Sequence, residues 1–182
     1  MEFHDIDKDF VSLYNIPIKL WNSTKTRYNM IIAFAGHSLV SSHSKVKEMV
    51  KNQIRDNITN AKAITCYLGG YGDFDEICSQ ACRELKHEYA DIEIVYVTPY
   101  MTLSEQEKIK EMQRYGLCDT SIYPPIENTP PRFAILKRNE WIMANADLII
   151  AYVKRSYGGA YKSLVVARRK KKKIINICDF LE

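Results

Sequence analysis

Short apolar runs alternate with helix-like segments along most of this sequence, and the alternation restricts the fold more than any other feature. The five runs that have the length of buried strands are residues 30–36, 64–68, 92–97, 147–153 and 174–178. Strands that are separated by helices pair in parallel, because a parallel connection needs a crossover. We therefore predict an α/β fold, a Rossmann-like open parallel sheet of five strands in the order 3-2-1-4-5, with helices on both faces.

The segments between these strands have a helical period. The predicted helices are residues 45–58, 74–85, 104–116, 132–146 and 158–170. Ser44 and Asp73 are predicted N-caps, and Ser104 with Glu107 has the spacing of a capping box. Residues 117–131 contain several prolines and are predicted to be a long loop, which in a compact domain usually binds or covers something.

Length and composition indicate one domain. Of the 182 residues, 46% are hydrophobic, which is enough to fill a core. We predict a single domain over residues 29–182, preceded by an N-terminal extension at residues 1–28. No apolar run approaches the roughly 20 residues that span a bilayer, and the first ten residues lack the apolar core of a signal peptide. We expect a cytoplasmic protein that does not enter a membrane.

The cysteines indicate reduced thiols. They lie at positions 66, 78, 82, 118 and 178, an odd number without a CxxC pair. Cys78 and Cys82 share a helical face, but no second pair of ligands completes a zinc site. We therefore predict no metal.

Much of the net charge of +4 comes from one basic run, Arg168 to Lys173. Such a run is typical of a solvated helix end, where cations interact favourably with the helix dipole. It is also compatible with binding of a polyanion such as nucleic acid. We favour the solvated helix end.

Three glycine loops follow predicted strands and meet at one crevice if the strand order is correct. They are "GHS" at 36–38, "GGYGD" at 69–73 and "YGGAY" at 157–161. In open parallel sheets, ligands bind at such a crevice beyond the strand ends. Glycine allows close approach of the backbone, and the next helix attracts an anion through its N–H groups. These loops predict a phosphate-bearing ligand, although tight turns alone also explain glycines.

Candidate ligand-binding residues come from these loops and from the helix before the fourth strand. Arg138 on that helix either reaches the crevice or pairs with Asp147. Tyr71 and Tyr157 are candidates to stack on a base. The full set is Gly36, His37, Ser38, Gly69, Gly70, Tyr71, Gly72, Asp75, Arg138, Asn139, Tyr157, Gly158, Gly159 and Ala160.

Several motifs resemble the SLOG superfamily. They are "AGHS", "GG" followed by "FD" at Asp75, "PPRFAILKRNEWIMANADLIIAYV", "YGGA" and "KKKIINI". The superfamily includes the Lonely-guy phosphoribohydrolases, the related domain of DNA processing protein A and a bacterial group of unknown function called DUF1273, which this sequence resembles most. The resemblance implies a Rossmann-like fold that binds nucleotides or nucleotide-derived ligands, and often a homodimer, to which residues 132–143 would offer a helical face.

The resemblance also locates a departure from the phosphoribohydrolases. Their motif GGxGTxxE follows a helix and strand that correspond here to Arg138, Met143 and Asp147. At the matching place this chain has Gly158 and Gly159, but Val165 stands where the catalytic Glu is expected. Ser38 likewise replaces an Arg that relatives often use as a phosphate clamp.

We therefore expect a binding protein that senses or sequesters a nucleotide-derived, phosphate-bearing small molecule, such as one like ADP-ribose, with no other cofactor. An alternative is an enzyme that hydrolyses an N-glycosidic bond with Asp75 or Glu76 as acid or base. A weaker alternative is nucleic-acid binding through residues 168–173.

Overall fold

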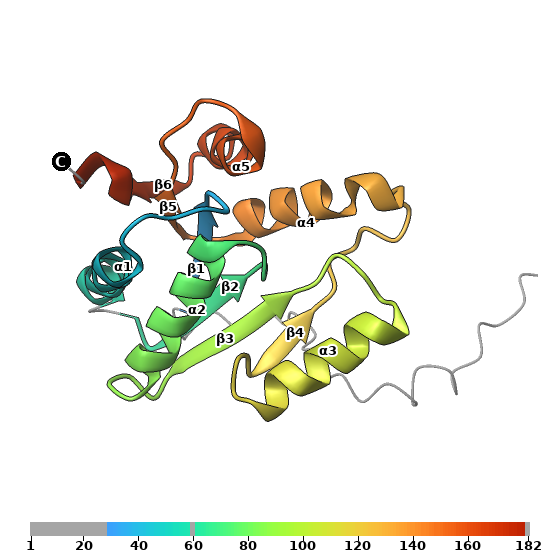
Figure 1. The fold of residues 1–182 in the computed structure, drawn as a ribbon, viewed down its shortest axis with the longest axis horizontal. Coiled ribbons are helices and arrows are strands. Elements are labelled where there is room, and N and C mark those ends of the chain that lie inside the picture. The colour runs from blue at the N-terminus through green and yellow to red at the C-terminus, as the bar shows by residue number, and fades with distance from the viewer. Residues whose placement is uncertain (1–28, 59–60, 181–182) are drawn as a thin grey trace, which may run out of the picture.

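The computed structural model describes residues 29–58 and 61–180 and contains one six-stranded sheet (Figure 1). All strand pairs are parallel, and the order is β4-β3-β2-β1-β5-β6. The strands are β1 (Asn29–Gly36), β2 (Ala63–Leu68), β3 (Ile92–Val97), β4 (Thr120–Ile122), β5 (Leu148–Tyr152) and β6 (Lys173–Asn176). The predicted Rossmann-like fold is confirmed. The predicted extension at residues 1–28 lies outside the described residues.

The predicted order 3-2-1-4-5 is present within this sheet, but one strand was missed. β4 extends the sheet beyond β3, inside the segment predicted to be only a loop. Its three residues carry too little pattern to stand out, and they are fixed by pairing with β3 over Val95↔Thr120 to Val97↔Ile122. Asp119, just before β4, strengthens the junction because its Oδ2 accepts a hydrogen bond from the Ile94 N–H at 2.7 Å.

Helices cover both faces of the sheet, as predicted. They are α1 (His43–Ile58), α2 (Asp73–Lys86), α3 (Leu103–Arg114), α4 (Pro131–Asn145) and α5 (Gly158–Arg169), followed by a short 3-10 helix, η1 (Ile177–Phe180). α1 and α2 pack on one face, where the apolar side of α3 also joins the core. α4 and α5 lie together on the other face (Figure 1).

Each face has its own buried core. Val46, Val50, Ile54 and Ile58 are all buried, so the four-residue spacing in the sequence does mark the inner face of α1. The other core is built around small strand residues such as Ala33 and Ala35 of β1, which let α4 and α5 approach the sheet closely.

Two helix starts differ from the predicted caps. α1 begins at His43, so Ser44 lies inside the helix. α2 has Gly72 at its N-cap, and Asp73 is the first helical residue. The Asp73 carboxylate instead accepts a hydrogen bond from the Val40 N–H at 3.0 Å, which ties the loop after β1 to the start of α2.

The predicted capping box of α3 is also wrong. The N-cap is Thr102, whose hydroxyl accepts a hydrogen bond from the Glu105 N–H at 3.3 Å. Ser104 lies two residues after this N-cap and is already inside the helix, which starts at Leu103.

All five cysteines are free thiols, and only Cys178 is partly exposed. Among the described residues, no group of histidine, cysteine or acidic side chains is arranged to hold a metal ion. In the same part of the chain, no helix is long and apolar enough to cross a bilayer.

Candidate functional site

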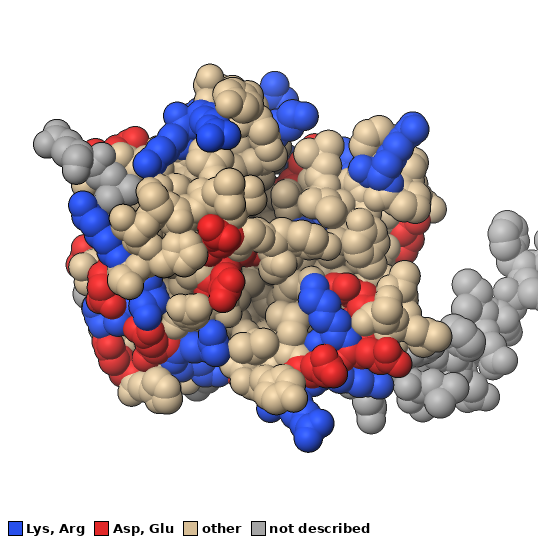
Figure 2. Space-filling view, in the orientation of Figure 1, with Lys and Arg blue, Asp and Glu red and all other residues tan. Residues whose placement is uncertain are grey.

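A cleft of about 470 Å³ opens where the loops after β1, β2 and β5 meet. This is the switch point of the sheet, because the chain proceeds from β1 to β2 on one side and reaches β5 on the other. The centre of the face shown in Figure 2 is hollowed, with acidic side chains beside the hollow, whereas Lys and Arg gather mainly towards the edges of the face.

The cleft brings together thirteen of the fourteen predicted ligand-binding residues. Those that line it are Gly36, His37, Ser38, Gly69, Tyr71, Gly72, Asp75, Arg138, Asn139, Tyr157, Gly158, Gly159 and Ala160. Gly70 does not line it and instead packs against the ring of Tyr96. Glu76 is exposed, is hydrogen-bonded to Gln80 and also lies outside the cleft lining.

Arg138 is the most deeply buried charged group of the cleft. Its side chain reaches from α4 to the glycine loop, where Nη1 donates hydrogen bonds to the carbonyl oxygens of Gly69 at 2.7 Å and Val97 at 2.8 Å. The residue is 1% exposed. The predicted alternative, a pair with Asp147, is wrong, because the Asp147 carboxylate accepts a hydrogen bond from the Ile31 N–H.

The guanidinium of Arg138 is not fully satisfied by the protein. Among the described residues, Nε has no hydrogen-bond partner. Desolvation lowers the pKa of Arg138, although the nearby Asp75 acts in the opposite direction. An arginine nevertheless stays charged in proteins, so the cleft wall carries a buried cation with unused N–H capacity.

Asp75 lies in the first turn of α2 and supports the glycine loop. Its Oδ2 accepts a hydrogen bond from the Tyr71 N–H at 3.0 Å. Desolvation raises the pKa of Asp75, while the Tyr71 N–H and the charge of Arg138 oppose the rise. The carboxyl group therefore braces its own loop and is also a weaker acid than an exposed Asp.

His37 connects the loop after β1 to the loop after β5. Its Nε2 accepts hydrogen bonds from the backbone N–H groups of Lys154 at 2.9 Å and Arg155 at 3.3 Å. Burial and the charges of Arg155 and Lys154 lower the pKa of His37. The ring is thus neutral with its proton on Nδ1, and Nε2 is already occupied by the protein.

The N-terminus of α5 forms the opposite wall. Its N-cap is Tyr157, and no side chain in the described part of the chain caps the first turn. The first N–H groups of a helix have no partners inside the helix, and with the helix dipole they favour an anion. Arg155, which we had not predicted, also lines the cleft beside them. Its position three residues before Gly158 was the only sequence signal for it.

Two tyrosines stand at the cleft, and both lie near cations. The Tyr71 ring is 47% exposed, with the guanidinium carbon of Arg138 5.3 Å from the ring centroid. Tyr157 is 66% exposed, and the guanidinium carbon of Arg155 is 5.9 Å from its ring centroid. Each ring therefore offers a surface on which a planar ligand group can stack.

Comparison with solved structures finds proteins that share the fold of this chain. DNA processing protein A from Streptococcus pneumoniae superposes with a TM-score of 0.56 and 16% identity, covering 80% of this chain and 49% of that one. The protein of the same name from Helicobacter pylori is described as binding single-stranded DNA. It superposes with a TM-score of 0.50 and 16% identity, covering 80% of this chain and 63% of that one. The molybdenum cofactor carrier protein from Chlamydomonas reinhardtii superposes with a TM-score of 0.47 and 14% identity, covering 80% of this chain and 74% of that one.

The chain thus spans about half to two thirds of the length of the two DNA processing proteins. Comparisons of the sequence with protein-family models and with curated proteins found no match.

Proposed function

We propose that this protein binds a small, phosphate-bearing, nucleotide-derived molecule in the cleft and releases it unchanged. The observation that carries the proposal is the buried guanidinium of Arg138. Its Nε has no partner, and the α5 N-terminus in the same cleft has no side-chain cap, among residues 29–58 and 61–180. Burying a cation is costly unless something compensates for it. An anion held by the α5 N–H groups would provide that compensation within the cleft.

The remaining cleft residues fit the other parts of such a ligand. Asn139 offers an amide, Asp75 accepts hydrogen bonds from hydroxyl groups, and Tyr157 offers an exposed ring. A volume of about 470 Å³ is within the range of small-molecule sites. The SLOG relationship and its DUF1273-like branch belong to this proposal, supported by the fold and by the motifs around Arg138 and Gly158.

A thermal-shift screen followed by calorimetry tests the proposal. The panel comprises nucleoside monophosphates and diphosphates, ADP-ribose, cyclic nucleotides and inorganic phosphate. A true ligand at 100 times its Kd adds about 2.7 kcal/mol to the free energy of unfolding. If no member of the panel raises the melting temperature, the proposed ligand class is wrong.

A second candidate function is hydrolysis of an N-glycosidic bond. The raised pKa of Asp75 inside the cleft favours it, since a general acid must hold its proton near the working pH. Chromatography of a nucleoside monophosphate or NAD after incubation with the protein distinguishes the two functions. Our first proposal predicts that all of the compound is recovered, whereas release of the free base that disappears in Asp75→Asn would establish the enzyme.

Nucleic-acid binding is the least supported of the three candidate functions. The basic run begins in the last turn of α5, whereas the cleft lies at the N-terminal end of this helix, so the run is not part of the cleft. Binding through this run would weaken steeply with salt and survive changes in the cleft.

We also propose a cytoplasmic location, since buried free thiols are typical of reducing compartments. The homodimer that the SLOG resemblance implies is a proposal as well. The N-terminal half of α4 exposes Phe133, Ile135 and Leu136, an apolar surface of the kind found at interfaces. Light scattering over a concentration series tests the dimer.

A further inference from the structure

The first glycine loop, residues 69–72, already faces an anion that belongs to the protein. The Tyr71 N–H donates a hydrogen bond to Oδ2 of Asp75 at 3.0 Å, and a Cβ added at Gly69 would lie 3.2 Å from the same oxygen. Desolvation raises the pKa of Asp75, whereas the N–H groups of the loop oppose the rise. Backbone N–H groups at such a turn are a common site for anions. In this loop the Asp75 carboxylate takes that place.

The start of α5 is the counterpart that the described residues leave unoccupied. The N–H groups of Lys154 and Arg155, shortly before it, donate to Nε2 of His37 at 2.9 and 3.3 Å. In the first turn of α5 itself, no side chain of the described residues caps an N–H group. No described atom lies within 4 Å of a Cβ added at Gly158 or Gly159. A phosphate therefore finds both N–H donors and room at this wall of the cleft.

The charges that line the cleft are sufficient for one phosphate group. They are Arg138, Arg155 and Asp75. Arg138 is buried, and within residues 29–58 and 61–180 its Nε has no partner and its guanidinium forms no ion pair. Arg155 is exposed, so salt and water screen its charge. A phosphate at α5 uses the one buried cation, and a second phosphate would face Asp75 and the acidic side chains beside the hollow in Figure 2.

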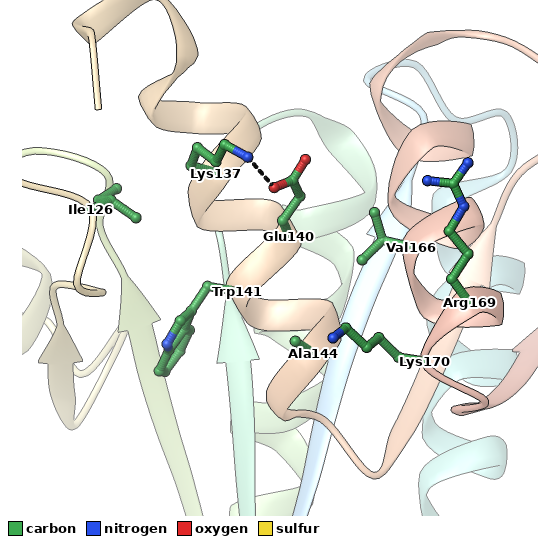
Figure 3. Close-up of a pocket in the computed structure, with 8 residues that line it drawn as sticks. All are labelled: Ile126, Lys137, Glu140, Trp141, Ala144, Val166, Arg169 and Lys170. Carbon is green, nitrogen blue, oxygen red and sulfur yellow. Dashed lines mark hydrogen bonds and ion pairs between the residues drawn. The ribbon is translucent and has the colours of Figure 1, made fainter. Parts of the chain in front are cut away.

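A second hollow, beside α4, is a poorer place for a phosphate although cations surround it (Figure 3). Lys137 there is paired with Glu140 at 2.8 Å. Arg169 lies in the last turn of α5, and Lys170 is the C-cap of this helix. At a helix C-terminus the free backbone groups are carbonyls and the dipole is negative, so both disfavour an anion. This hollow therefore serves as a control for non-specific attraction of anions.

We propose that Asp75 makes the cleft selective for ligands with a single phosphate group, which the N-terminus of α5 holds. This inference rests on the proposed function and narrows its ligand class. A second phosphate that extends across the cleft from α5 meets the Asp75 carboxylate and is repelled. A ribose or another neutral, hydroxylated group suits the same space, since a carboxylate accepts hydrogen bonds from hydroxyl groups. Compounds that carry a diphosphate, such as ADP-ribose, are therefore disfavoured.

Calorimetry with probes that differ only in the number of phosphates tests the selectivity. The probes are phosphate against pyrophosphate, and nucleoside monophosphates against the diphosphates of the same base, at pH 8 without divalent cations. We expect wild type to bind the monophosphate at least about fivefold more tightly than the diphosphate, the scale of one carboxylate acting across a partly solvated cleft.

Two variants assign the selectivity to one residue. Asp75→Asn keeps an acceptor oxygen for the Tyr71 N–H and should shift the affinity ratio about tenfold towards the diphosphate, since it removes one charge. Glu76→Gln is the matched control, because it removes the same charge from the adjacent, exposed position outside the cleft lining. The ratio in Glu76→Gln should stay that of wild type.

The outcomes separate this inference from the function on which it rests. If wild type binds the diphosphate as tightly as the monophosphate, the selectivity is wrong and the binding function stands. An unchanged ratio in Asp75→Asn, or an equal shift in Glu76→Gln, would show that Asp75 is not its source. If none of the probes binds, the proposed function itself fails. Weaker monophosphate binding in Arg169→Glu would place the phosphate in the hollow beside α4 and overturn both.

Discussion

The two glycine pairs at the cleft look alike in the sequence but have opposite surroundings. A Cβ at Gly69 would lie 2.5 Å from Nη1 of Arg138, and one at Gly70 would lie 2.5 Å from the Tyr96 ring. At Gly158 and Gly159, by contrast, no atom of the described residues lies within 4 Å of an added Cβ. The first pair is therefore needed for packing. The second leaves open space in front of a helix N-terminus, which is what a bound anion requires.

The largest expected loss of stability comes from adding a side chain at the first glycine pair, Gly69 and Gly70. Gly69→Ala should lower the free energy of unfolding by about 3 kcal/mol, because the new methyl group displaces a buried guanidinium that is held by two hydrogen bonds. Gly159→Ala should change the free energy of unfolding by less than about 0.5 kcal/mol, since the methyl group meets no atom of the described residues. Urea denaturation of both variants measures the difference, and equal losses would remove the contrast between the loops.

A smaller loss of stability is expected when the hydrogen bond between Asp75 and the first glycine loop is removed. Asp75→Ala leaves the Tyr71 N–H without its acceptor and should cost about 1–2 kcal/mol. Asp75→Asn keeps an acceptor oxygen in the same place and should cost less. If both substitutions cost the same amount, the hydrogen bond to Tyr71 is not what holds the loop.

The ion pairs between α1 and α2 provide a control region away from both loops. Hydrogen bonds from Lys47 and Lys51 lower the pKa of Glu84 to about 2. Because this folded-state pKa lies below the unfolded value, the contribution is complete above about pH 4.5 and is lost as the pH falls towards 2. Glu84 is 41% exposed, so we expect only about 1 kcal/mol. Denaturation at pH 6 and pH 3 should show this difference in the wild type and a reduced one in Glu84→Gln, with ligand binding at pH 7 unaffected.

The smallest expected change in stability concerns His37, which links the loops after β1 and β5 by its hydrogen bonds. The pKa of His37 is lowered in the folded state, so its contribution to stability is present above about pH 6.5 and is lost as the pH falls below that value. We expect less than about 1 kcal/mol, because the ring is only partly buried. His37→Gln should flatten the stability profile between pH 7 and pH 5, and an unchanged slope would show that other groups control it.

Periodicity was sufficient to predict five of the six strands, because buried faces impose regular spacing on the sequence. Their order was assumed for a Rossmann-like sheet, and the expected crevice followed from that order and from the glycine loops. Periodicity did not reveal β4, which depends on pairing with β3 rather than on its own residues. The hydrogen-bond partners of Arg138 also could not be predicted from the sequence. Its partners Gly69 and Val97 lie 69 and 41 positions away, and only the folded chain brings them together. For the same reason, the two glycine pairs could not be told apart from the sequence.

The central claim is that the open glycine pair holds an anion, and one pair of affinities tests it most directly. Gly159→Asp and Gly159→Ala both place a side chain in the same empty space, but only Asp adds a charge. With a ligand identified by the screen, we predict that Gly159→Asp weakens binding at least about 100-fold, because a carboxylate near the anion costs several kcal/mol at protein-like dielectric. Its melting temperature should stay close to that of Gly159→Ala. A folded Gly159→Asp protein that binds as tightly as wild type would contradict this account.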